Sequence, residues 1–405
     1  MSFSLALSGL NAASTDLNAT ANNIANASTT GFKGARTEFA DLFSVSPQGT
    51  SNTQTGNGVR VANVAQQFAQ GNVEVTGNSL DMAISGEGFF ILSDGGALSY
   101  SRAGAFQVDA NGNVVNSKNQ ALQVYPVNPG GGFNTGGLTD LRLISGVSAP
   151  AATGNAQVLF NLPADAVPPT GTPFNPANVT TYNEATSLTV YDSLGAAHTA
   201  TMYFVKDAAA NDWNTRLYID GTAVGGIQDL QYSSSGTLTV PAGGTITFPP
   251  YAPTTGAAPM NITFDMVGTT QYGSNFSVNS VTQDGYTTGR LIGIDFDSNG
   301  VVQSRFTNGR SVPLGQIALA NFSSVQGLQQ LDSTQWAETF ASGQPLRGQA
   351  GNSGLGLIQS GSLEASNVDL TAQLVNMITA QRNFQANAQV ISTSDQITQT
   401  IINIR

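Results

Sequence analysis

The strongest candidate for a metal-binding site is the polar run at 295–300, Asp-Phe-Asp-Ser-Asn-Gly. It matches the opening of a calcium-binding helix-loop-helix motif, in which carboxylate and amide oxygens alternate along the chain. That motif needs a bidentate Glu at its twelfth position, where this chain has Phe306, and flanking helices where strands are expected here. We therefore predict a simple hairpin turn, because Asp, Asn and Gly also favour turns.

Other catalytic chemistry has little support in the residue types. The chain has one histidine, His198, and no cysteine, which excludes two-histidine zinc motifs, thiolate metal sites and cysteine nucleophiles. The glycine pairs lack the third glycine of a dinucleotide fingerprint, and there is no Gly-x-Ser-x-Gly elbow. We interpret His198, which follows a turn, as a surface or packing residue. We predict no catalytic residue, no metal, no cofactor and no enzymatic activity.

The composition excludes two classes of partner. Charged residues make up 10% of the 405 residues, and the net charge of -11 is spread thinly along the chain. Because the 14 Lys and Arg residues form no patch, we expect no binding to nucleic acid. No apolar run approaches the ~18 residues of a membrane span, so we expect no membrane insertion. The first basic residue is Lys33, which predicts export, if any, without a cleaved signal peptide.

The two ends of the chain, which must position any assembly surface, carry matching apolar stripes. Before residue 25 and after residue 369, apolar side chains recur at alternating steps of three and four. This spacing places them along one narrow face of a helix, as in the seam of a coiled coil. We predict a core-helix seam for assembly, formed by Phe3, Leu7, Leu10, Leu17, Ile24, Leu370, Leu374, Met377, Phe384 and Ile391.

The remaining faces of these helices indicate what surrounds them. From residue 366 onward the only charged residues are Asp369, Arg382, Asp395 and Arg405, while Asn and Gln fill eleven positions. An exposed helix usually carries many Glu and Lys, since about a quarter of average residues are charged. A lone hairpin of two such helices buries too little apolar surface to be stable. A hairpin packed on the chain's own body stays an alternative, but we predict neighbouring copies around these helices.

Between the terminal helices the sequence predicts antiparallel β structure in nested domains. Short β-rich runs separated by Gly-containing turns lie at 71–76, 80–85, 88–92, 105–108, 113–115, 187–190, 200–205, 291–296 and 314–322. We predict a mainly β fold with helical termini and five segments: 1–70, helix and linker of a coiled-coil core; 71–145, first part of an inner β domain; 146–284, an inserted outer β domain; 285–360, second part of the inner domain; and 361–405, the C-terminal core helix. Gly136, Gly137 and Gly285 are possible hinges.

Three separate stretches of the sequence resemble one known family. Ser8-Gly-Leu-Asn-Ala, Ala21–Asn26 and Thr30–Lys33 resemble the amino-terminal signature of bacterial flagellar rod and hook proteins. Leu80–Gly86 with Tyr100–Arg102 resembles their inner-domain motif, and Gly361–Leu370 with Met377–Arg382 their carboxy-terminal signature. The family-motif residues are Asn22, Asn23, Asn26, Gly31, Phe32, Lys33, Asn367, Asp369, Gln381 and Arg382. One departure is Gln373, where the family pattern has Glu.

The inserted segment narrows the resemblance within the family. Val190–His198, Tyr203–Lys206 and Trp213 look like the outer domain of the hook members, which rod members of the family lack. The resemblance implies a structural subunit of a curved, tubular homopolymer that acts as a universal joint, transmits torque from rod to filament and encloses an export channel. It also implies a place outside the cell in the bacterial flagellum.

The same resemblance implies a set of partners. These are copies of the chain itself, the distal rod protein, the hook-filament junction protein, the hook cap protein, the hook-length ruler protein and the type III export apparatus. Two alternatives remain open at this point: a distal rod protein of the same family, and a secreted β-rich adhesin or glycan-active protein. An adhesin or enzyme would not need terminal helices with so few charges.

Overall fold

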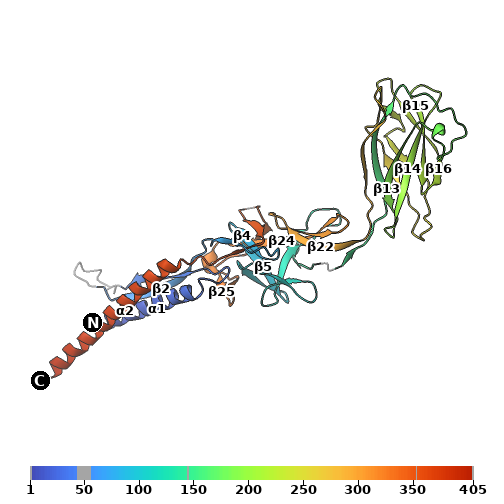
Figure 1. Ribbon diagram of the computed structural model, residues 1–405. Coiled ribbons are helices and arrows are strands. Elements are labelled where there is room, and N and C mark those ends of the chain that lie inside the picture. Colours follow the sequence, from blue (N-terminus) through green and yellow to red (C-terminus); the bar gives the residue numbers. More distant parts are fainter. Residues whose placement is uncertain (1, 43–55, 144–145, 353, 404–405) are drawn as a thin grey trace. The chain divides into compact units, whose positions relative to one another are not determined.

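The computed structural model describes residues 2–42, 56–143, 146–352 and 354–403 (Figure 1). Over these residues the chain has an α-helix at each end and 29 strands between them. It divides into two compact units: unit 1 comprises residues 1–145, 293–305 and 311–405, and unit 2 comprises residues 146–292 and 306–310. The prediction of a mainly β fold with helical termini is confirmed.

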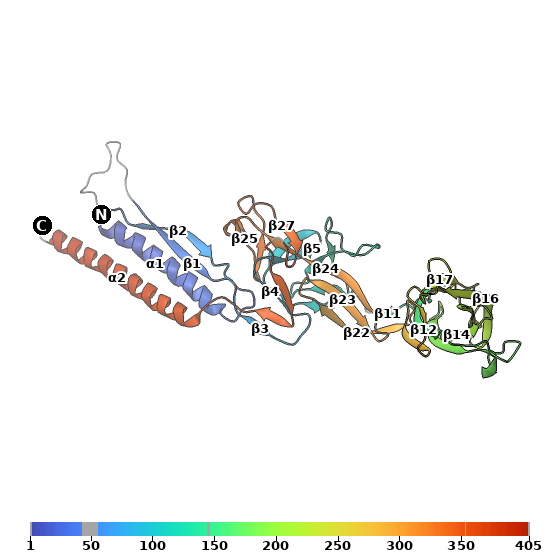
Figure 2. The ribbon, with the colours of Figure 1, turned by 90° about the horizontal axis from the view of Figure 1, so that it is seen from above.

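The helical part of unit 1 contains α1 (Ser2–Ala25), α2 (Leu370–Asn403) and a hairpin of β1 (Ala35–Asp41) and β2 (Val59–Gln66). Figures 1 and 2 both show the two helices side by side and antiparallel, with the end of α2 extending past the start of α1. The strand pair lies against α1, where the hydroxyl of Ser8 accepts a hydrogen bond from the backbone N–H of Val59.

The β part of unit 1 is built largely from short strands. Its strands are β3 (Val73–Val75), β4 (Met82–Ser85), β5 (Phe89–Asp94), β6 (Ala97–Ser101), β7 (Gln107–Val108), β8 (Val114–Val115), β9 (Ala121–Tyr125), β10 (Thr139–Asp140), the end of β22 (Gly289–Phe296), most of β23 (Val301–Phe306), β24 (Ser311–Asn321), β25 (Gln329–Gln330), β26 (Gln335–Ala337), β27 (Leu346–Gln349), β28 (Leu357–Ser360) and β29 (Ser362–Glu364), with a 3-10 turn at Val325–Gly327. The main sheet runs in the order β23-β24-β9-β5-β6-β26-β25.

Two central strands of this sheet are buried on both faces. Along β5, Phe90 and Leu92 enter one apolar cluster, while Phe89 and Ile91 enter another on the opposite face. The same alternation occurs along β24. Side chains of a strand point alternately to opposite faces, so an unbroken apolar run is what a strand covered on both sides requires. The run at 88–92 therefore becomes the centre of the unit 1 core.

Unit 2 is a sandwich of two sheets. Its strands are β11 (Val147–Ser148), β12 (Asn155–Pro163), β13 (Glu184–Tyr191), β14 (Ala197–Lys206), β15 (Asp212–Ile219), β16 (Thr222–Tyr232), β17 (Leu238–Val240), β18 (Thr245–Thr247), β19 (Thr263–Asp265), β20 (Thr270–Tyr272) and β21 (Ser277–Gln283), together with the start of β22 and a 3-10 turn at Val179–Thr181. One sheet has the order β13-β14-β15-β16-β17, and the other is centred on β12.

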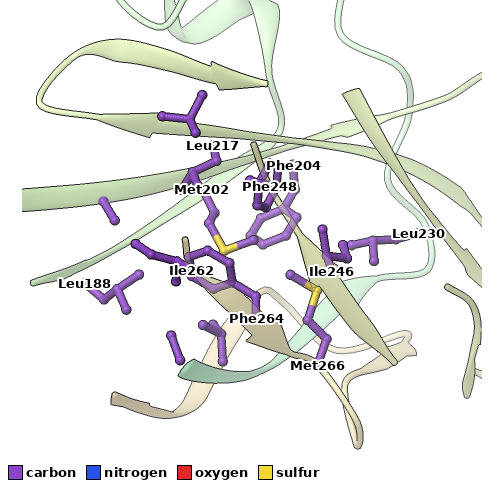
Figure 3. Packing of buried hydrophobic residues seen from close by; sticks show 14 of the residues in the cluster. Leu188, Met202, Phe204, Leu217, Leu230, Ile246, Phe248, Ile262, Phe264 and Met266 are labelled. Carbon is purple, nitrogen blue, oxygen red and sulfur yellow. The ribbon is translucent and has the colours of Figure 1, made fainter. Parts of the chain in front are cut away.

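Alternating residues of the two sheets form the core of unit 2. On β14 and β15 every second side chain is buried, including Met202, Phe204 and Trp213. Figure 3 shows Met202 and Phe204 gathered with Phe264 and Met266 of the opposite sheet in one cluster. Interdigitated inner faces of this kind are the usual core of a β-sandwich.

The compact units differ from the predicted segments in two places. Residues 285–292 and 306–310 lie in unit 2, whereas the sequence assigned them to the inner domain. The reason is local pairing: Tyr286 exchanges backbone hydrogen bonds with Ala151, and Arg290 is paired with Val147. The segment 295–300 forms the turn before β23, in which the carboxylate of Asp297 accepts hydrogen bonds from the N–H groups of Asn299 and Val301.

The predicted hinges do not lie where the chain crosses between the units. Gly136 and Gly137 belong to a loop between β9 and β10 within unit 1, and Gly285 belongs to unit 2. A Cβ atom on Gly285 would lie 2.3 Å from the hydroxyl oxygen of Thr153, so close packing accounts for this glycine. The crossings are at 145–146, 292–293, 305–306 and 310–311. A hinge role for these glycines stays a prediction.

Candidate functional site

The family-like motifs meet in unit 1, at the place where the terminal segments join the β part. Strand β29 pairs with β3, and β28 pairs with β4, which brings residues 357–364 beside residues 73–85. The N–H of Gly31 donates to the carbonyl of Glu364 over 2.8 Å. We call this region, made of residues 30–34, 67–71, 100–103 and 361–369, the terminal junction.

Two asparagines bind the backbone on both sides of the terminal junction. The amide of Asn23 accepts from the N–H of Ala35 over 2.8 Å and donates to its carbonyl over 2.7 Å. Asn367 accepts from the N–H of Gly34 over 2.8 Å and donates to the carbonyls of Gln67 and Ala69. Each position uses both the donor and the acceptor of the amide, which explains why Asn occurs here rather than Asp.

A third contact links the helices directly and involves the residue that departs from the family pattern. The amide nitrogen of Asn23 also donates to the side-chain oxygen of Gln373 on α2, over 3.3 Å. Gln373 therefore contributes a neutral hydrogen bond between α1 and α2 at the position where a Glu was expected.

The ends of the helices are fixed by side chains of the same motifs. Asn26 donates to the carbonyl of Asn22 and accepts from the hydroxyl of Thr29, which stabilises the turn after α1. At the start of α2 the carboxylate of Asp369 accepts from the N–H groups of Thr371 and Ala372 over 2.8 and 3.1 Å. Asp369 is thus the N-cap of α2.

Gly31 permits a close backbone approach in the terminal junction. Its φ is +67°, and a Cβ atom there would lie 2.5 Å from the backbone nitrogen of Ala103. Any other residue would both strain the backbone and clash. The buried ring of Phe32 follows directly, so the motif places an apolar anchor and then a charged side chain in the interior.

The charged side chain is Lys33, and it is paired inside the protein. Its ammonium nitrogen lies 2.6 Å from Oε1 of Glu364, and both side chains are 0% exposed. The other carboxylate oxygen, Oε2, lies 3.3 Å from Nη1 of Arg102, whose side chain is 5% exposed. One carboxylate therefore serves two cations, one from the N-terminal segment and one from the β part.

Backbone groups complete the coordination of this ion network. Lys33 donates to the carbonyl of Ala69, Arg102 donates to the carbonyls of Ile84 and Gly86, and the N–H of Gly71 donates to Glu364. Burial lowers the pKa of Lys33, although the attraction of Glu364 opposes that change. Burial lowers the pKa of Arg102 in the same way.

The predicted seam residues divide into two groups. Leu10, Leu17, Ile24, Met377, Phe384 and Ile391 are half-buried, whereas Phe3, Leu7, Leu370 and Leu374 are exposed. The buried apolar positions on the helices are small ones, Ala6, Ala12, Ala13 and Ala380. Where α1 meets α2, a Cβ atom on Gly9 would lie 2.6 Å from the amide oxygen of Asn387. Small residues let the two helix axes approach closely.

The other side of α2 leaves large apolar side chains in contact with solvent. Together with Leu370 and Leu374, the exposed set comprises Val375, Ile378, Val390, Ile397 and Ile402. Gln381 and Arg382 are exposed on the same helix. We call this set the outer face of α2; at ~100° per residue its members are spread around the helix and do not form one stripe. An amphipathic helix in water normally keeps its large apolar side chains on the covered face.

Sequence reasoning quoted Glu364 and Arg102 within motifs but did not name them as site residues. The available signal was that each is the only charged residue within Gly361–Val368 and Tyr100–Phe106. Over the described ranges, no group of three or more His, Cys, Asp and Glu side chains is placed to hold a metal ion. Neither helix, over the residues that the structure describes, is long and apolar enough to cross a membrane.

Comparison with known proteins agrees with this arrangement over the full length. Residues 3–33 match the family described as flagella basal body rod protein, and residues 359–404 match the flagellar basal body rod FlgEFG protein C-terminal family. Residues 83–190 match the flagellar hook protein FlgE/F/G D1 domain, and residues 161–286 match the flagellar basal body protein FlaE D2 domain.

Whole-length relatives decide between the branches of the family. The chain is 39% identical to the flagellar hook protein FlgE of Escherichia coli K12 over 413 residues, covering 100% of both chains. It is 38% identical to that of Salmonella typhimurium and 33% identical to that of Borreliella burgdorferi, with coverage of 98% or more. The chain belongs to the flagellar hook protein family. Members of this family are structural proteins.

A solved structure of a hook protein shows the same fold. The flagellar hook protein FlgE2 of Helicobacter pylori matches 72% of this chain and 100% of its own, with a TM-score of 0.54 and 12% identity.

Proposed function

We propose that this chain is the structural subunit of a bacterial flagellar hook, a tubular homopolymer that joins rod to filament and transmits torque. The observation that carries the proposal is the outer face of α2, an apolar surface that no other described residue covers, in a protein related over its full length to hook proteins. We propose that other copies of the chain cover this face, because every subunit of a homopolymer makes the same contacts with its neighbours.

The two units differ in ways that fit different roles in the polymer. The terminal helices have few charges, so packed layers of them would form a stable inner tube around an export channel lined by Asn and Gln. Unit 2 carries its own closed core, so its outer contacts with other copies can be weak, wet and easily exchanged as the joint bends. This allows the rows of subunits to lengthen and shorten during each rotation.

The proposal carries the partners and location that the family implies. We propose export through the type III apparatus and assembly under a cap protein. The polymer would contact the distal rod protein at one end and the hook-filament junction protein at the other, and a ruler protein would set its length. Its place would be outside the cell, in the flagellum.

Electron microscopy of the purified chain tests the proposal. The wild-type chain should form hollow, curved tubes, and Leu374→Asp should abolish them, because it puts a charge into the apolar contact. The matched control is Leu194→Asp, which adds the same charge at an exposed leucine of unit 2, where contacts with other copies are proposed to be weak. Equal polymerisation by the two variants, or no tubes from the wild-type chain, would contradict the proposal.

A further inference from the structure

The ion network of the terminal junction has an unusual charge balance. Two cations, Lys33 and Arg102, share the single carboxylate of Glu364, and all three side chains are buried. A buried charge is costly unless it is paired and hydrogen-bonded. Each partner is therefore needed for the burial of the others.

The three charges come from three separate parts of the chain. Lys33 lies between α1 and β1, Glu364 ends β29 just before α2, and Arg102 follows β6 in the β part. If the N-terminal segment docked alone, the terminal junction would hold two cations with no anion. If the C-terminal segment docked alone, Glu364 would already be paired with Arg102, but the contacts of Gly31 and Asn367 with the other segment would be missing.

We propose that Lys33, Glu364 and Arg102 form a charge latch, which lets the N-terminal segment dock on the inner β part only after the C-terminal segment has placed Glu364. The proposal rests on the proposed function, because the docked terminal helices are the surface that other copies bind. Glu364 is then a positioning residue for assembly, and loss of the latch leaves the helices undocked while the β cores stay folded.

The number of unpaired buried charges predicts how strongly each variant is impaired. Lost hydrogen bonds alone would predict a different order. Glu364→Gln leaves two buried cations and no buried anion, because Glu87, which also attracts Arg102, is exposed to solvent. Lys33→Met leaves one cation and one anion, because the Arg102–Glu364 pair remains. The double variant Lys33→Met/Glu364→Gln leaves one cation, so Lys33→Met should repair part of the damage caused by Glu364→Gln.

The test uses the full chain and measures the concentration at which it polymerises. Glu364→Gln should raise this concentration on the order of a hundredfold, because it leaves buried charge uncompensated. Lys33→Met should raise it about tenfold or less, and the double variant should lie between the two. Lys118→Met is the matched control, since Lys118 pairs with Asp332 at the surface and should cause no change.

A second measurement keeps the test independent of polymerisation. Chymotrypsin digestion of the monomers should remove the terminal segments fastest from Glu364→Gln, while near-UV circular dichroism should show intact β cores. A double variant as defective as Glu364→Gln, or more so, in both measurements would overturn the latch. A wild-type chain that forms no tubes would contradict the proposed function, and the digestion rates would still decide the latch.

Discussion

Unit 2 and the helical part of unit 1 treat large apolar side chains in opposite ways. In unit 2, Phe160, Phe204, Trp213 and Phe264 are fully buried between two sheets. Along α2, the outer face leaves side chains as large as Ile378 in contact with solvent. Burial of apolar area is the main stabilising term in folding, so unit 2 has already gained this free energy within one chain. The helices gain theirs only when other copies cover them.

The largest expected effect that tests this comparison is a matched pair of leucine truncations. Leu217 in unit 2 is 2% exposed, and Leu374 on α2 is 46% exposed. Leu217→Ala should lower the free energy of unfolding of unit 2 by about 2–5 kcal/mol, because it removes buried methyl groups and leaves a cavity. Leu374→Ala should change the stability of the monomer little and weaken polymerisation instead.

The two tryptophans allow each unit to be followed separately. Trp213 lies in the unit 2 core and Trp336 in unit 1. In a Trp336→Phe background, the fluorescence of Trp213 reports the denaturant unfolding of unit 2 alone. Leu374→Ala should destabilise the monomer less than Leu217→Ala. Equal destabilisation would contradict the contrast between the buried core of unit 2 and the exposed apolar surface of α2.

A smaller effect is expected at the start of α2. Asp369→Ala removes the carboxylate that accepts from the N–H groups of Thr371 and Ala372, and should cost about 1 kcal/mol of helix stability. The helix content of the chain, measured by far-UV circular dichroism, should fall, and the stability of unit 2 should not change. Asp369→Asn is the control, because Asn caps helices nearly as well. A loss as large with Asn as with Ala would argue against capping.

Parts of the fold follow from patterns that depend on local periodicity. The run at 88–92 predicted a strand, and β5 lies there, covered on both faces. The stripes at both ends predicted helices, and α1 and α2 lie there. Periods of two and of 3.6 residues depend only on the backbone geometry of each element, so a single sequence contains them.

The contacts between segments were harder to predict. The seam for assembly was predicted from the large side chains and stays a prediction; within the chain, α1 and α2 approach closely at a small residue, Gly9, whose Cβ would lie 2.6 Å from the amide oxygen of Asn387. Glu364 meets Lys33 across 331 residues, and no local pattern encodes that pairing. His198 was interpreted as a surface or packing residue. It is buried between two carboxylates, Asp192 in the turn before β14 and Asp220 in the turn after β15.

The smallest expected effect is a pH dependence confined to unit 2. The two ring nitrogens of His198 lie 2.5 Å from Asp220 and 3.3 Å from Asp192. Burial by itself lowers the pKa of His198, but the hydrogen bonds to both carboxylates outweigh it and leave the pKa raised. Burial likewise opposes ionisation of Asp192, while hydrogen bonds from Thr255, Ala196 and His198 bring its pKa down to about 2.

These two shifts act on stability in opposite pH ranges. Because the folded pKa of His198 is above its ordinary value, its stabilisation is complete below about pH 6.5 and disappears as the pH rises through the folded pKa. The stabilisation from Asp192 is present above its ordinary pKa and disappears as the pH falls toward 2. Unit 2 should therefore be most stable in mildly acidic solution, as measured by denaturant unfolding followed at Trp213.

His198→Gln should flatten the decline in the stability of unit 2 on the alkaline side, because Gln does not titrate. The core of unit 1 should show no matching decline. An equal decline in the variant would show that the charge on His198 does not hold these turns together.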